Sequence, residues 1–206
     1  MSPESISPVL SNRLLQQFVA VLTDEIGPES LPLVLAKVNL SPSVIEKEAL
    51  DRLDGTSAAE VYAWLQQAMR LFYGRGARGT LVRIGRGMWE KMTEQATLRE
   101  RAELQIIRVL PVPARRRRVL EFVAERLHEG GGAVSVQLLD IDLLLADRSG
   151  AAAWGQSDDK PICFVTLGLI QGALSWATRQ EADVEEITCK ATGASACEFK
   201  VKLGGK

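Results

Sequence analysis

Apolar residues recur at every third or fourth position through the first two thirds of the chain, which is the spacing of amphipathic helices. The first such stripe runs from Leu10 to Leu22 and is made of leucine, valine and phenylalanine. Ser7 and Pro8 stand just before it, and serine followed by proline is a common helix cap and first residue. We therefore expect the first helix to begin at Ser7–Pro8.

Capping boxes mark two further helix starts. In this motif, the first side chain accepts a hydrogen bond from the fourth backbone N–H, and the fourth side chain accepts one from the cap. The sequence has Ser57-x-x-Glu60 and Thr97-x-x-Glu100, each followed by helical spacing of apolar residues. Pro113 opens another helical stripe, which ends at a run of three glycines. Since glycine commonly ends a helix, that run is the predicted stop.

The pattern changes after the glycines. Apolar and polar residues alternate over 134–138, which is the period of a strand, and the alternation shifts phase near Leu139. A phase shift of this kind predicts a turn, and hence a hairpin. An uncharged helix follows over 161–178, and two more strand-like runs cover 184–191 and 196–203.

These elements predict an α/β protein of the α+β kind, in which helices pack on a small antiparallel sheet. The C-terminal third reads as a β-β-α-β-β unit behind an all-helical first part. We place an N-terminal helical region at 1–112 and an α/β domain at 113–206, together forming one compact unit.

Composition narrows the function. The 206 residues are 46% hydrophobic, and 25 basic side chains nearly balance 26 acidic ones. A disordered chain is therefore excluded, and no basic field favours nucleic acid. The uncharged run 161–178 contains a proline and two glycines, so we expect a buried helix and no membrane span. With one histidine, His128, catalysis has few candidate groups, and we assign no catalytic residues.

Two motifs have simpler structural explanations. Gly74-x-Gly76-x-x-Gly79 matches a dinucleotide-binding fingerprint, but a long helix precedes it where that fingerprint needs a strand. A connection between helices is the better interpretation, with Arg75 and Arg78 still able to receive one carboxylate or phosphate. The run of arginines at 115–118 is interpreted as a solvated helix face.

The cysteines form the strongest candidate site. Cys189 and Cys197 flank a predicted turn and would face each other across a hairpin, while Cys163 opens the uncharged helix. No export signal is evident in the first residues, so we expect a cytoplasmic protein with reduced thiols. Strand geometry alone would add Glu185 as a fourth metal ligand, because residues i and i+4 of a strand share a face. Glu186 would point away unless the strand is bent.

The spacing of these residues resembles the 4-vinyl-reductase domain family. The matching pattern is Pro161-x-Cys163, a helix, Glu186-x-x-Cys189, Gly193 and Cys197-x-Phe199. The family includes a bacteriochlorophyll-biosynthesis protein, sensor domains of aromatic-responsive bacterial activators and, more distantly, the TRAPP vesicle-tethering subunits. In the sensor domains the pattern is similar to a zinc site. The resemblance implies a structural Zn²⁺ held by Cys163, Glu186, Cys189 and Cys197, and therefore a bend at Glu186.

The resemblance also implies a homodimer with an apolar pocket between helices and sheet. We expect a binding or carrier protein for a hydrophobic ligand, which would be an aromatic, a fatty acyl chain or a tetrapyrrole. The alternatives are a divinyl reductase or accessory enzyme of bacteriochlorophyll synthesis, for which the residues supply no electron source, and a dimerising adaptor. Trp89, Phe122 and Trp154 are candidate ligand contacts. The helix over 161–178 is apolar around most of its circumference, so we expect part of it, or of an N-terminal helix, to be buried between subunits.

Overall fold

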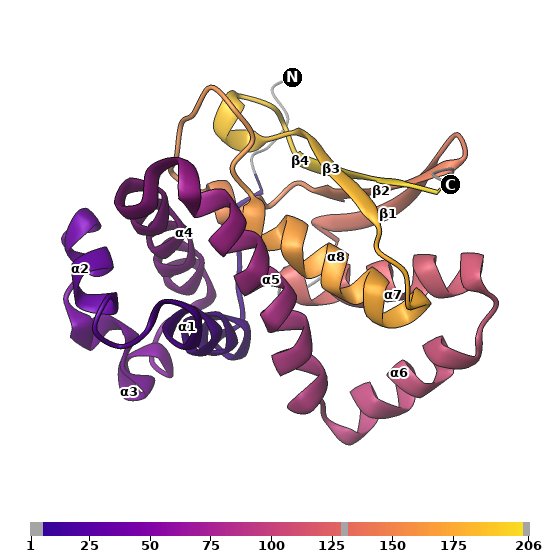
Figure 1. The fold of residues 1–206 in the computed structure, drawn as a ribbon, viewed down its shortest axis with the longest axis horizontal. Coiled ribbons are helices and arrows are strands. Elements are labelled where there is room, and N and C mark those ends of the chain that lie inside the picture. Colours follow the sequence, from indigo (N-terminus) through magenta and orange to yellow (C-terminus); the bar gives the residue numbers. More distant parts are fainter. Residues whose placement is uncertain (1–5, 129–131, 204–206) are drawn as a thin grey trace.

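Eight α-helices and a four-stranded antiparallel sheet make up residues 6–128 and 132–203, the part of the chain that the computed structural model describes (Figure 1). The α-helices are α1 (Asn12–Ile26), α2 (Leu31–Leu35), α3 (Lys47–Leu50), α4 (Gly55–Tyr73), α5 (Ala77–Glu94), α6 (Leu98–Val109), α7 (Val112–Leu127) and α8 (Phe164–Thr178). The short 3-10 helices are η1 (Ala36–Val38), η2 (Pro42–Ile45), η3 (Gly74–Gly76), η4 (Ala151–Ala153) and η5 (Lys190–Thr192). The strands are β1 (Val134–Leu139), β2 (Asp142–Asp147), β3 (Asp183–Thr188) and β4 (Cys197–Lys202).

Helices α1 and α4 begin at residues other than those predicted. Helix α1 begins at Asn12 and not at Ser7–Pro8, because Ser11 Oγ accepts the N–H of Leu14 at 3.2 Å. Residues 6–10 form no helix or strand, and the N–H of Leu10 donates to the carbonyl of Gly55.

Helix α4 begins two residues before the predicted cap. Asp54 is the true cap, since its carboxylate accepts the N–H of Ser57 at 2.8 Å. The predicted box at Ser57 and Glu60 is therefore wrong, and Ser57 lies in the first turn.

The predicted start of α6 is confirmed, while α8 begins at Phe164, later than the predicted run 161–178, with Cys163 as its cap residue. Both hydrogen bonds of the capping box are present at α6, from the N–H of Thr97 to Glu100 and from the N–H of Glu100 to Thr97. Helix α7 begins one residue before Pro113 and ends at Leu127. Of the three glycines expected to stop it, Gly130 and Gly131 lie outside the described residues.

The sheet has the order β1-β2-β4-β3 with antiparallel neighbours throughout. Strands β1 and β2 form the predicted hairpin, in which Leu139 pairs with Asp142. The phase shift near Leu139 comes from a tight turn in which Asp140 has a positive φ of 55°, a conformation that aspartate tolerates better than most residues. With α8 between the two strand pairs, the C-terminal β-β-α-β-β unit is confirmed.

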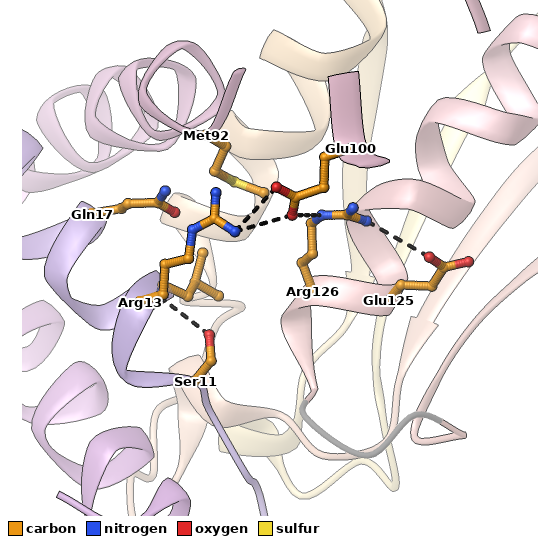
Figure 2. Close-up of a pocket in the computed structure, with 8 residues that line it drawn as sticks. Ser11, Arg13, Gln17, Met92, Glu100, Glu125 and Arg126 are labelled. Atoms are coloured by element: carbon orange, nitrogen blue, oxygen red, sulfur yellow. Dashed lines mark hydrogen bonds and ion pairs between the residues drawn. The ribbon is translucent and has the colours of Figure 1, made fainter. Parts of the chain in front are cut away.

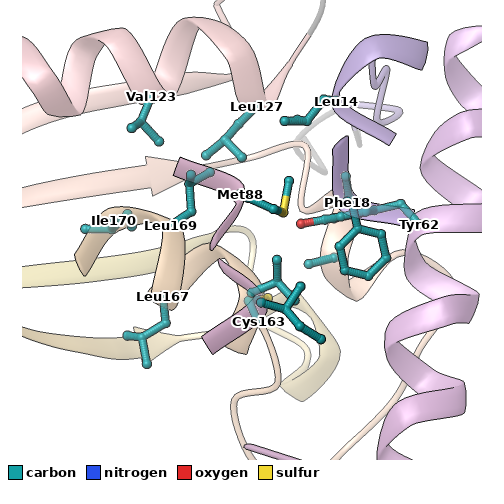
Figure 3. Packing of buried hydrophobic residues seen from close by; sticks show 14 of the residues in the cluster. Leu14, Phe18, Tyr62, Met88, Val123, Leu127, Cys163, Leu167, Leu169 and Ile170 are labelled. Atoms are coloured by element: carbon teal, nitrogen blue, oxygen red, sulfur yellow. The ribbon is translucent and has the colours of Figure 1, made fainter. Parts of the chain in front are cut away.

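Helix α8 lies at the centre of the molecule, between α5 and the sheet (Figure 1). Helices α7 and α8 contact each other and the strands, and the core between them is shown in Figure 3. The buried side chains there include Leu169 and Ile170 of α8, Val123 and Leu127 of α7, and Met88 of α5. The chain therefore covers α8 with its own helices, and a subunit interface is not needed to bury it. That reason for expecting a dimer was wrong.

No helix in the described residues is long and apolar enough to cross a bilayer.

Paired glycines let α5 and α8 approach each other closely. A Cβ on Gly85 of α5 would overlap the carbonyl oxygen of Val165, and one on Gly168 of α8 would overlap that of Val82. Glycine costs helix propensity at such positions, so its presence in both helices indicates a packing requirement. The backbone contact fixes α8 against the N-terminal helices.

Replacing Gly85 by alanine should therefore lower the free energy of unfolding by about 2 to 3 kcal/mol, because the added methyl must push the helices apart. Gly79→Ala in the same helix is the matched control. Its Cβ would lie 3.7 Å from Arg83 Nη1, an ordinary contact, so the change should raise stability by about 0.5 to 1 kcal/mol. Urea unfolding followed by circular dichroism measures both. Equal effects of the two substitutions would contradict the close contact.

Candidate metal centre

Four potential metal ligands come together where α8 begins. Cys163 is the cap residue of α8, Cys189 follows the last residue of β3, and Cys197 is the first residue of β4. Glu186 extends from β3 itself. Residues that are 34 positions apart in the sequence are thus joined in one cluster.

The ligand atoms are close to one another. The Sγ atom of Cys163 lies 3.4 Å from that of Cys197 and 3.7 Å from that of Cys189, and the last two are 4.0 Å apart. One atom from each cysteine and one oxygen of Glu186 all lie within 4.8 Å of one another. All three cysteines are buried and none forms a disulfide.

A bulge in β3 brings Glu186, and not Glu185, to the cluster. The pairing of β3 with β4 shifts register between Glu186 and Thr188, and such a shift turns a side chain away from simple alternation. Glu186 Oε2 accepts the N–H of Cys163 at 2.9 Å, while Oε1 is buried without a hydrogen-bond partner. Glu185 is exposed and pairs with Lys202. The bend required for Glu186 is therefore present.

The pKa values of the four clustered residues are shifted in different directions. Hydrogen bonds from the neighbouring thiols lower the pKa of Cys189, so this residue carries the first thiolate. Its hydrogen bond to that thiolate then raises the pKa of Cys163. The contact with Cys163 lowers the pKa of Cys197, but the Cys189 thiolate and burial outweigh it and raise the pKa. Burial, together with the charge of Cys189, raises the pKa of Glu186 to about 8.

Arg70, which the sequence did not indicate, interacts electrostatically with the cluster. Arg70 of α4 is partly buried, and desolvation lowers its pKa, while the charges of Asp158, Cys163 and Cys189 act in the opposite direction. Its Nη1 atom is buried without a partner. Arg70 lies in α4, far before Cys163 in the sequence, so no local spacing pointed to it.

A backbone group also bonds to the cluster: the N–H of Lys190 donates to Cys197 Sγ at 3.4 Å. Its ammonium group bonds instead to the carbonyls of Arg148 and Ser149.

The cluster has the dimensions of a tetrahedral thiolate site. Zinc–sulfur bonds of about 2.3 Å in a tetrahedron place the sulfur atoms about 3.8 Å apart. The three sulfur–sulfur distances, 3.4, 3.7 and 4.0 Å, lie on both sides of this value. The unpartnered oxygen of Glu186 would be available as a fourth donor. Three thiols and a carboxylate therefore fit a zinc ion without a change of fold.

The glycine motif and the arginine run have structural roles. Residues 74–76 form η3 between α4 and α5, so no strand precedes the motif and the predicted helix connection is correct. In α7, Arg117 and Arg118 pair with Glu121, and Arg118 also pairs with Glu103. These arginines form ion pairs within α7 and from α7 to α6.

The predicted ligand-contacting aromatics do not form one group. Trp89 and Phe122 are both buried and pack edge to face, with ring centroids 5.8 Å apart. Trp176 of α8 joins them at 5.3 Å from Trp89, and the guanidinium of Arg108 lies 4.6 Å from the centre of the Trp176 ring. Trp154 follows η4, and none of the aromatic pairs in the described residues includes it.

A groove of about 520 Å³ lies beside these tryptophans. Trp89 and Trp176 form its aromatic wall, and Gln171 and Ser175 of α8 add polar groups. The indole N–H of Trp89 is buried without an acceptor. A small molecule bound in this groove would therefore contact aromatic side chains.

Figure 2 shows another pocket, of about 350 Å³, where α1 meets α6 and α7. Glu100 lies there between two guanidinium groups, 3.1 Å from Arg13 Nη1 and 3.4 Å from Arg126 Nε. Since Glu100 also caps α6, this network serves to hold the helices together.

Comparison with known proteins agrees with this geometry. The 4-vinyl-reductase domain family matches residues 146–203, which include all four clustered residues. This part of the chain is a 4-vinyl-reductase domain. An uncharacterized protein of Methanocaldococcus jannaschii is 43% identical over 47 residues, which are 23% of this chain. The chain spans 26% of that relative's length.

Solved structures of H-NOX proteins have the same fold. An H-NOX protein from Shewanella oneidensis in the Fe(II)NO ligation state aligns over 95% of this chain and all of its own, with a TM-score of 0.58 and 14% identity. The Fe(II)CO state of an H-NOX domain from that organism covers 92% of this chain and 98% of its own, at 0.54 and 16%. A structure concerned with haem redox potential and porphyrin distortion covers 94% and 100%, at 0.54 and 15%. The chain therefore has an H-NOX-like α+β fold.

Zinc affinity should depend steeply on pH. The raised pKa values of Cys163, Cys197 and Glu186 mean that these groups hold protons near neutrality, and a metal must displace them. We expect affinity to rise about tenfold or more per pH unit between about pH 6 and 8. Competition with a chelator of known affinity measures it. An affinity that does not change over this range would contradict the proton-holding cluster.

Proposed function

We propose that the protein is a small-molecule-binding or carrier protein for a hydrophobic ligand, built around a structural zinc site. The observation that carries the proposal is the group formed by Cys163, Glu186, Cys189 and Cys197, whose atoms lie within 4.8 Å of one another. Four protein ligands would leave zinc no open position for water, so the ion would have a structural role.

Zinc at this position would contribute directly to folding. It would connect the start of α8 to the last hairpin, closing a loop between Cys163 and Cys197. The sheet has only four strands, and a cross-link between distant parts of a small core contributes to folding stability. Arg70 supplies a nearby positive charge, which supports an anionic set of ligands at this depth.

The fold is consistent with ligand binding, since two of the similar H-NOX structures are in Fe(II)NO and Fe(II)CO ligation states. The residues present do not fit haem itself, which needs an axial ligand at the wall of its cavity. His128, the one histidine, is buried at the end of α7. Five pockets among the described residues have walls without histidine, cysteine or tyrosine, and the methionine that lines one of them, Met92, lies in the charged pocket of Arg13, Glu100 and Arg126. We therefore propose a hydrophobic ligand that needs no axial bond.

Substituting Cys189 or Cys197 by serine should remove the metal and lower the melting temperature, because each thiolate is one of four ligands. Glu186→Gln should weaken zinc binding less, since an amide oxygen still coordinates. Metal analysis of protein prepared without chelator, with thermal melts, measures both effects. We expect close to one zinc per wild-type chain and less than about a tenth in the cysteine variants.

Glu185→Gln is the matched control for Glu186, because Glu185 is its neighbour in β3 but pairs with Lys202 on the surface. It should retain full zinc. If wild-type protein contains no zinc, or if Glu185→Gln loses as much metal as Glu186→Gln, the proposed ligand set is wrong.

A homodimer remains part of the proposal, with α6 as its surface. Leu98, Ile106 and Val109 of this helix are 85%, 61% and 81% exposed, and a row of exposed apolar side chains is typical of a protein interface. Ile106→Glu should therefore give a monomer in light scattering at micromolar concentration. Leu138→Glu, the same change at an exposed apolar position in β1 and away from α6, should stay dimeric. A wild-type monomer would contradict the dimer.

A further inference from the structure

A pocket of about 610 Å³ lies directly beside the candidate metal centre. Its apolar side is formed by Pro161, Phe164 and Leu167 at the start of α8 and by Val184 of β3. Glu186 lines the same pocket and also belongs to the metal cluster. The volume is within the range of small-molecule sites, which is about 300 to 1,000 Å³.

Two positive side chains at this pocket have no acidic partner. Arg78 and Lys160 both line it and are exposed, and neither forms an ion pair within the part of the chain that the structure describes. The guanidinium of Arg78 lies 5.7 Å from the centre of the Phe164 ring. Positive charge is thus held next to an apolar surface, as a carboxylate on an apolar molecule requires.

The remaining charges limit which anion fits. Lys202, at the same pocket, is paired with Asp183 at 3.2 Å and with Glu185 at 3.3 Å. These two carboxylates exceed the one ammonium group between them, and Glu186 adds a third carboxyl group to the pocket, so a molecule with several negative charges would be repelled. A single carboxylate placed near Arg78 and Lys160 would not be.

We propose that this pocket binds an amphipathic monocarboxylate, an aromatic or aliphatic acid whose apolar body lies against Phe164 and Leu167 and whose carboxylate faces Arg78 and Lys160. The inference rests on the proposed function as a binding protein and names the site and class of ligand. It also accounts for Arg78, which the glycine motif placed at the opening of α5.

The test uses calorimetry on zinc-loaded protein with 2-naphthoate and decanoate as probes. The neutral counterparts 2-naphthalenemethanol and 1-decanol keep the apolar body and remove the charge, and adenosine monophosphate supplies a polyanion. Each acid should bind at least about fivefold more tightly than its alcohol, as expected for two exposed ionic contacts. The nucleotide should not bind. An aromatic source and a fatty-acid source are distinguished by which acid binds more tightly.

Variants locate the site. In the double variant Arg78→Gln and Lys160→Gln, both changes are on the surface, so the fold is retained, and the affinity for the acids should fall about tenfold while that for the alcohols stays unchanged. Arg75→Gln is the matched control, since Arg75 is exposed in the same connection but does not line the pocket. Methyl signals of Leu167 and Val184 should shift on titration in NMR spectra.

Failure of this inference differs from failure of the proposed function. Acids that bind equally well to the double variant, or that shift other methyl groups, would overturn the pocket and leave a binding protein with another site, such as the groove beside Trp89. Absence of zinc with binding that still depends on Arg78 and Lys160 would overturn the metal proposal alone. No binding by any probe would overturn both the pocket and the carrier function.

Discussion

The close contact between α5 and α8 is the constraint on which the rest of the structure depends. Gly85 and Gly168 let the backbones meet, and no side chain can replace hydrogen there without moving a helix. Helix α8 is thereby fixed between the N-terminal helices and the sheet, with its first turn beside the last hairpin. Since Cys163 is the cap of α8, the position of this helix also decides where the first thiol of the cluster lies.

The cluster joins the edge of the sheet to the start of α8. Strands β3 and β4 pair with each other, and β4 pairs with β2, but β3 is the edge of the sheet. The bulge at Glu186 interrupts pairing at that edge, which costs backbone hydrogen bonds. The hydrogen bond from the Cys163 N–H to Glu186 offsets part of this cost, because it ties the irregular strand to the buried start of α8.

The sequence predicted features with local causes. Thr97 and Glu100 form their capping box because both partners lie within one turn, and the alternation before Leu139 ends at a turn. The prediction of the start of α4 was wrong because a second capping residue lies nearby. Asp54 precedes Ser57 and caps the helix in its place. Contacts between residues far apart in the sequence could not be predicted from local patterns. Arg70 acts on the cluster from a helix far earlier in the chain, and α8 is covered by α5 of the same chain.

The sharing of Glu186 between the cluster and the adjacent pocket has a physical consequence. One oxygen accepts the N–H of Cys163, the other is buried without a partner, and the same residue forms part of the pocket wall. A metal that orders this side chain fixes that part of the wall, and a ligand that contacts the wall restricts the side chain in return. Because such coupling is reciprocal in free energy, a site of four protein ligands that does no chemistry would still influence what the neighbouring pocket binds.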